Sequence, residues 1–233
     1  MEQKRFILNT FRTLSFRLAY ETFNRSLNYG SVHLILGDRG SGRTTVANCF
    51  VKDFNDKRKV ALVHCEHARG GTLLFKMCAA IIPDFDWPFI KTNVYGYMQR
   101  LRHYLLSGEC PTRLIILDDF ALKEYATIIE LLEALEAPLN RGSVGVVIIS
   151  TPGEYDHEFV HKSLFKKFSR LLYVSGKGQR MLPGPIRMTP PSIADINAIA
   201  KSKGLTDVKP LIGSRTIGEL KQKLKKLHNQ QYA

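Results

Sequence analysis

A glycine-rich loop between an apolar run and a helix start is the feature that most constrains this chain. The apolar run ends at Leu36, and the loop follows as Gly37-Asp38-Arg39-Gly40-Ser41-Gly42-Arg43-Thr44-Thr45. This order fits the phosphate-binding P-loop pattern G-x-x-x-x-G-K-[ST] with one change, an arginine at the lysine position. Glycines permit the tight turn, and backbone N–H groups of the loop and helix start then point at phosphate oxygens. The sequence therefore predicts a strand, loop and helix that bind a nucleoside triphosphate.

The residues of this loop have distinct expected roles. All residues from Gly37 to Thr45 are candidate ATP contacts, and the Thr44 hydroxyl is a candidate Mg²⁺ ligand. Arg43 keeps the positive charge of the usual lysine, but its planar guanidinium is larger, so we expect it to hold phosphate in a different pose. The alternative is a glycine-rich turn from strand to helix that holds no ligand.

A second motif, typical of the Walker B strand of ATPases, supports the first. The apolar run Leu114–Leu117 ends in the carboxylates of Asp118 and Asp119. Asp118 is expected to hold Mg²⁺, and Asp119 is a catalytic candidate because many P-loop ATPases carry there the glutamate that polarises the attacking water. Aspartate is one methylene shorter, which limits its reach. The alternative is a buried strand with a solvated acidic end, and the P-loop upstream favours the functional interpretation.

Composition and charge limit the classes of partner. The chain has 233 residues, 44% of them hydrophobic, which suits one domain or one domain with a small appendage. Its net charge of +13 favours a polyanion, and nucleic acid is the commonest one. Basic residues are dense in 4–25, 162–187 and 221–226, although a solvated helix face accounts equally well for any one of these runs. The charge gives no support to a small-molecule kinase.

The lack of a recognisable secretory or membrane signal, together with the scattered cysteines, indicates a reducing compartment. No apolar run approaches the roughly 20 residues needed to span a membrane, and the first residues lack the long apolar segment of a secretory signal. The four cysteines are scattered without a C-x-x-C pair, which is typical of a reduced protein. We therefore expect a cytoplasmic, nucleoid-associated protein with no membrane partner.

The order of elements predicts an α/β fold with a mostly parallel sheet flanked by helices. Strands are expected at 33–36, 60–65, 114–117, 144–149 and 171–174, and helices at 71–82, 94–106, 124–135 and 155–168. We divide the chain into an N-terminal helical segment (1–30), an α/β core (31–175), a basic flexible insertion (176–191) and a helical lid (192–233). Ser192 and Asp195 have the spacing of a helix N-cap and its third helical position.

These motifs together resemble one group of AAA+ ATPases. The chain is similar to the ATPases that assist DNA transposition, the group that includes MuB, TnsC, TniB and the ExeA-type ATPases. The resemblance covers roughly residues 20–228. It rests on the P-loop Gly37–Thr44, the pair Asp118-Asp119, the segment Phe168-Ser169-Arg170 and the lid segment Ile193–Ala200.

The resemblance implies roles for three more residues. Arg170 matches the arginine that reaches into the neighbouring subunit's nucleotide and stabilises charge on the γ-phosphate. Ser150, or Thr151 beside it, occupies the strand end where such ATPases place a polar contact to the γ-phosphate. Lys221 falls where similar proteins carry a nucleotide-contacting arginine in the lid. The alternatives are a solvated arginine at 170 and a polar strand cap at Ser150.

The resemblance also implies partners and an activity. It implies ATP-dependent rings or helical filaments on duplex DNA, held through phosphates without reading sequence, and a transposase that is recruited or activated. Arginine at 43, aspartate at 119 and lysine at 221 depart from the usual nucleotide contacts and suggest slow hydrolysis. Two alternatives stay open: a helicase loader or replication-type ATPase, and an ATP-binding assembly protein that has lost catalysis.

Overall fold

The computed structural model describes residues 13–54, 57–66, 68, 70–83, 85, 94–120, 135–151, 186–202, 204–205, 208–214 and 216–231. Several sequence predictions lie outside these residues. They include most of the helix expected at 124–135, the helix at 155–168, the strand at 171–174, the first part of the basic insertion, and Arg170.

A five-stranded sheet forms the centre of the molecule, and its neighbouring strands pair in parallel. Its strands are β1 (Val32–Gly37), β2 (Val60–His64), β3 (Leu114–Asp118), β4 (Gly145–Ser150) and β5 (Ile186–Met188). They lie in the order β2-β3-β4-β1-β5, so β4 separates the P-loop strand from the Walker B strand. Every residue of β1, β3 and β4 is buried, as expected of parallel strands covered on both faces. The predicted α/β parallel sheet is confirmed.

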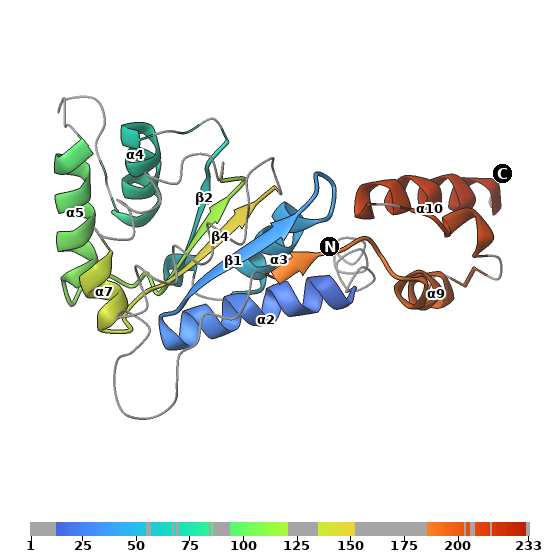
Figure 1. Ribbon diagram of the computed structural model, residues 1–233, viewed down its shortest axis with the longest axis horizontal. Helices are drawn as coiled ribbons and strands as arrows, with labels where there is room; N and C mark the ends of the chain where they lie inside the picture. Colours follow the sequence, from blue (N-terminus) through green and yellow to red (C-terminus); the bar gives the residue numbers. More distant parts are fainter. Residues whose placement is uncertain are drawn as a thin grey trace.

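Helices cover both faces of this sheet (Figure 1). The strand side chains alternate between two cores. One core packs against α4 (Gly70–Ile81), α5 (Val94–Leu106) and the short α7 (Glu136–Asn140). The other packs against α2 (Leu14–Tyr29) and α3 (Arg43–Asp53), where Phe23 and Phe50 are fully buried with ring centroids 5.1 Å apart. The helix expected within residues 1–30 thus forms over Leu14–Tyr29. In the described residues no helix has the length and apolar character to cross a bilayer.

The last strand of the sheet differs from the sequence prediction. Residues 186–188 were assigned to a flexible insertion, but they form β5 and pair with β1 at the edge of the sheet. Met188 is buried and Arg187 is exposed, which is the period-2 alternation of a strand. Three residues are too few for that period to stand out from the basic, proline-containing sequence around them.

A separate small core holds the C-terminal helices together. It joins α9 (Ile193–Ser202), the 3₁₀ turn η3 (Lys209–Leu211) and α10 (Ile217–Gln231) through buried apolar side chains, among them Ile196, Leu211 and Leu220. Figure 1 shows α9 and α10 beyond the carboxyl ends of the strands. This is the helical lid that the sequence predicts.

The N-terminus of α9 is capped as the sequence predicts and is joined to α2. Asp195 N donates to Ser192 Oγ at 3.1 Å, and Asp195 Oδ2 accepts from Ser192 N at 3.0 Å. This reciprocal pair is a capping box. Asp195 Oδ1 accepts from the backbone N–H of Leu14 at 3.2 Å, so the same carboxylate also holds the first residue of α2.

His33, inside β1, predicts a pH dependence of stability. The side chain is 6% exposed, and burial, with a smaller contribution from Arg25, lowers its pKa from 6.5 to about 4. Between these values the unfolded chain binds a proton that the folded chain does not, so stability is full above pH 6.5 and falls as the pH drops toward 4. We expect a loss of about 3 kcal/mol by pH 4 from this residue. Denaturant unfolding of wild type and His33→Gln across this range measures it, and equal pH dependence in both would contradict the assignment.

Candidate nucleotide-binding site

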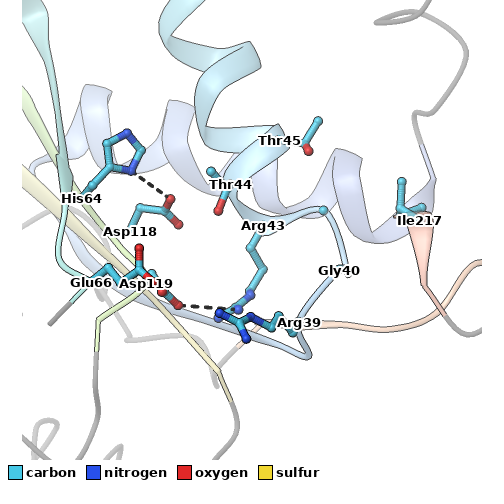
Figure 2. A pocket seen from close by; sticks show the side chains of 11 residues that line it. Arg39, Gly40, Arg43, Thr44, Thr45, His64, Glu66, Asp118, Asp119 and Ile217 are labelled. Atoms are coloured by element: carbon cyan, nitrogen blue, oxygen red, sulfur yellow. Dashed lines mark ion pairs between the residues drawn. The ribbon is translucent and has the colours of Figure 1, made fainter. Parts of the chain in front are cut away.

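A pocket of about 370 Å³ lies at the carboxyl ends of the parallel strands, between the P-loop and the Walker B strand. This is the edge at which open α/β sheets bind ligands. Figure 2 shows the side chains that line it. The lining residues are Arg39, Gly40, Gly42, Arg43, Thr44, Thr45, His64, Glu66, Asp118, Asp119 and Ile217.

Glycines make the loop possible. Gly40 and Gly42 have φ angles of 83° and 95°, in the left-handed region that side chains rarely adopt. A Cβ at Gly37 would lie 2.6 Å from Ser41 Oγ, so the loop closes tightly on its own first residue. Gly42 is the N-cap of α3 and provides no side-chain cap. The first N–H groups of this helix are therefore left for an anion at the pocket.

Arg43, the altered P-loop residue, is buried beside Asp119. Its side chain is 8% exposed, its Nη2 lies 3.8 Å from Asp119 Oδ1, and its buried Nη1 has no hydrogen-bond partner (Figure 2). Burial lowers the pKa of the guanidinium, and the carboxylates of Asp119 and Asp118 oppose that shift. The guanidinium stays protonated at neutral pH, because the ordinary pKa of arginine lies far above 7. The pocket thus contains a cation that is only partly compensated.

The backbone of Asp119 is left-handed, a conformation that favours aspartate over glutamate. Its φ is 56°, the one positive φ at a non-glycine residue in the described part of the chain. Aspartate is several-fold enriched in this left-handed region compared with most side chains. The shorter carboxylate at the position of the usual glutamate therefore fits the local conformation. Its side chain is 44% exposed and lies at the mouth of the pocket.

Asp118 is buried at the end of β3 and has one oxygen unused. Its Oδ2 lies 3.3 Å from His64 Nδ1, at the end of the neighbouring strand β2, and its buried Oδ1 has no partner. Thr44, in the first turn of α3, is exposed on the same pocket. A carboxylate oxygen and a hydroxyl are hard ligands of the kind that Mg²⁺ takes. These two residues fit the predicted metal site.

Three buried polar side-chain atoms without hydrogen-bond partners belong to this small region. They are Ser41 Oγ, Arg43 Nη1 and Asp118 Oδ1, and the described residues contain one further such atom, Ser26 Oγ on α2. Buried polar groups in folded proteins are almost always satisfied, and exceptions call for an explanation such as an absent ligand, water or ion. Two of these atoms belong to residues that line the pocket, Arg43 and Asp118, and a cation and a carboxylate oxygen suit a phosphate with its divalent ion.

The structure brings most of the predicted site residues together. Arg39, Gly40, Gly42, Arg43, Thr44, Thr45, Asp118 and Asp119 all line the pocket. Three further loop residues do not line the pocket: Gly37, Asp38 and Ser41. Lys221 lies on α10, but its side chain is outside the described residues, as is the whole of Arg170.

Ser150 is placed differently from its expected role. It ends β4, is buried, and its Oγ donates to the carbonyl of Phe120 at 2.6 Å. Phe120 N also donates to Ile149 O at 2.9 Å, so the end of β4 holds the residues that follow the Walker B pair. Ser150 does not line the pocket as described, and a γ-phosphate contact from it remains a prediction.

Sequence reasoning missed three lining residues: His64, Glu66 and Ile217. His64 could have been found, because it ends a strand and the carboxyl ends of parallel strands share one edge. Ile217 could not, because it begins α10 and reaches the loop through the tertiary fold. A Cβ at Gly42 would lie 3.5 Å from Ile217 Cγ1, which shows how closely the lid approaches the P-loop.

Comparison with known proteins gives a fold. No protein-family description and no curated protein matches this sequence. Among solved structures, Cdc6p from Pyrobaculum aerophilum superimposes with a TM-score of 0.57 at 14% identity, covering 92% of this chain and 60% of that one. The Orc1 protein of Aeropyrum pernix, solved in complex with DNA, gives a TM-score of 0.55 at 16% identity, covering 94% of this chain and 60% of that one.

The chain has an α/β P-loop NTPase fold. The similarity spans the sheet, its helices and the lid, because it covers more than nine-tenths of the chain. This chain spans about 60% of the length of either structure, so each contains parts that have no counterpart here. At this level of identity the comparison bears on the fold, and function rests on the site.

Proposed function

We propose that this protein is an ATP-dependent, DNA-binding AAA+ regulator of DNA transposition that assembles on duplex DNA, recruits or activates a transposase, and hydrolyses ATP slowly. The observation that carries the nucleotide part is the group of unpartnered buried atoms, Ser41 Oγ, Arg43 Nη1 and Asp118 Oδ1. Leaving such groups unsatisfied costs about 1–3 kcal/mol each. Arg43 and Asp118 line the pocket, and a bound phosphate with its cation would satisfy their two unpartnered atoms.

The residues of the pocket divide the work of holding ATP and Mg²⁺. The P-loop and the first turn of α3 would hold the phosphates, with Arg43 as the cation. Thr44 and Asp118 would hold Mg²⁺, whose chemistry is to offset charge on the phosphate oxygens. Asp119 would orient the attacking water, but its ion pair with Arg43 must loosen first. Because the Asp119 carboxylate would have to leave Arg43 in order to orient the water, we expect slow turnover.

The DNA and transposase parts rest on other grounds. The +13 charge supports a nucleic-acid partner. The transposase partner, the ring or filament, and the roles of Arg170 and Lys221 rest on the resemblance to the transposition ATPases. A replication-type ATPase is the second candidate, because it would share the same core and the same basic character. Affinity purification separates the two, because the first predicts co-purified transposase and the second a replicative helicase.

The deciding experiment compares ATP binding with ATP turnover, with and without duplex DNA. Wild type is expected to bind ATP in either condition, and to turn it over slowly and only with DNA. Arg170→Ala is expected to abolish that turnover and keep ATP binding, since this arginine would act on a neighbouring subunit's nucleotide. Binding and DNA assembly without any turnover would instead make ATP a structural ligand. Absence of nucleotide binding would refute the proposal.

A further inference from the structure

The edge of the sheet opposite the nucleotide pocket is strongly basic. Five exposed cations belong to the segments that lead into its strands or to the end of α2: Arg25, Arg58, Lys59, Arg113 and Arg141. We call this group the amino-end edge. None of its members lines the nucleotide pocket. Four of them, Arg58, Lys59, Arg113 and Arg141, fall outside the basic runs that the sequence singles out, because they stand in the segments that precede three different strands.

Backbone contacts fix these residues on one edge. Lys59 and Arg113 directly precede β2 and β3, and Arg113 N donates to Lys59 O at 2.8 Å. Gly145 N, at the start of β4, donates to Arg113 O at 2.8 Å, and Arg113 Nη1 donates to Ser143 O at 3.2 Å. Lys59 and Arg113 therefore lie side by side at the starts of neighbouring strands, with backbones on the order of 4.8 Å apart.

The remaining two cations continue this row toward α2. Arg141 ends α7, just before β4. The next residue, Gly142, packs so closely on the end of α2 that a Cβ at Gly30 would lie 2.7 Å from its backbone. Arg25, on the last turns of α2, is close enough to affect the pKa of His33, near the start of β1. The row thus extends from β2 to α2, with Glu109 near Arg58 as an acidic neighbour, since both act on Tyr104.

We propose that the amino-end edge binds the phosphate backbone of duplex DNA. A row of cations on a rigid sheet edge suits a regular line of phosphates, and arginine can hold a phosphate through two parallel hydrogen bonds. Contacts of this kind are made with phosphates and carry no sequence information, so we expect binding to be independent of sequence. Because the pocket lies at the other ends of the same strands, ATP and DNA occupy the protein together. This inference rests on the proposed function and names the surface through which it would act.

The test measures binding of a short fluorescent duplex by anisotropy, with ATP present, over a range of salt. The edge variant is Arg58→Gln/Lys59→Gln/Arg141→Gln. Its control has the same net charge, Arg100→Gln/Arg102→Gln/Lys201→Gln, and changes exposed residues on α5 and α9. The edge variant is expected to weaken binding roughly ten-fold or more and to reduce the slope of log K against log salt by about 3. The control should keep the wild-type slope, and both should bind ATP normally.

Different outcomes separate this inference from the proposed function. If wild type binds no duplex, the DNA part of the proposed function is wrong. If wild type binds and the edge variant and control bind equally well, only the amino-end edge is refuted. Should the triple variant lose ATP binding through misfolding, Arg25→Gln/Arg141→Gln replaces it. That pair is expected to reduce the slope by about 2, and an unchanged slope would overturn the inference.

Discussion

Replacing Arg43 with alanine is expected to weaken ATP binding by roughly 100-fold, because two charge-assisted hydrogen bonds to phosphate are lost at about 1.5 kcal/mol each. The folded protein without nucleotide should not suffer to the same degree. The guanidinium is buried, its Nη1 has no partner, and its contact with Asp119 is long at 3.8 Å. Removing it takes away an unsatisfied buried charge, so the melting temperature without ATP is expected to stay level or rise.

Arg43→Lys is the matched control for this experiment. Lysine restores the residue that the P-loop pattern calls for and keeps the charge, so ATP affinity is expected to remain within about ten-fold of wild type. Titration of a fluorescent ATP analogue measures affinity, and thermal melts without ligand measure the fold. Unchanged affinity in Arg43→Ala would show that the cation does not face phosphate. A large drop in melting temperature would show that its role is structural.

Asp118→Asn is expected to remove the effect of Mg²⁺ on nucleotide binding and to reduce turnover about 100-fold, because the neutral amide no longer offsets the charge of the metal ion. ATP affinity should fall to the value that wild type shows with a chelator, and the chelator should have no further effect on the variant. Binding measured with and without Mg²⁺ therefore gives a readout that a general loss of folding would not reproduce.

The neighbouring carboxylate is the control for Asp118. Asp119→Asn is expected to lower turnover while keeping the Mg²⁺ enhancement of binding, since Asp119 faces Arg43 and the mouth of the pocket. If Asp119→Asn removed the Mg²⁺ effect and Asp118→Asn kept it, the assignment of metal ligand and water-orienting residue would be reversed.

The sequence predicts those parts of the site whose residues lie close together along the chain. The P-loop and the end of β3 each lie within one short segment, so the spacing of Gly37, Gly42 and Thr44 and the run into Asp118 were enough. The fold class follows from the same alternation of strands and helices. Strand order does not, since no local signal places β4 between β1 and β3.

What sequence could not supply is set by contacts between distant segments. Ile217 reaches the P-loop because the lid core and the α2–α9 junction place α10 there. Ser150 shows the converse case. A polar residue at a strand end predicts a ligand contact, and the sequence gives no sign that its hydroxyl donates to the carbonyl of Phe120, 30 residues away. The departure at Asp119 is explained by a backbone angle that no residue pattern reports.

Asp195 joins the lid to the helix that precedes the P-loop strand. One oxygen closes the cap of α9 and the other accepts from the first N–H of α2, so a single carboxylate ties both helix starts to one point. Ser15 Oγ and Thr189 Oγ1, 2.9 Å apart, add a second tie beside it. The helices that follow this junction share their own core, and they place Ile217 against Gly42 of the P-loop. The position of Ile217 at the pocket therefore depends on residues far from it in the sequence, at the starts of α2 and α9.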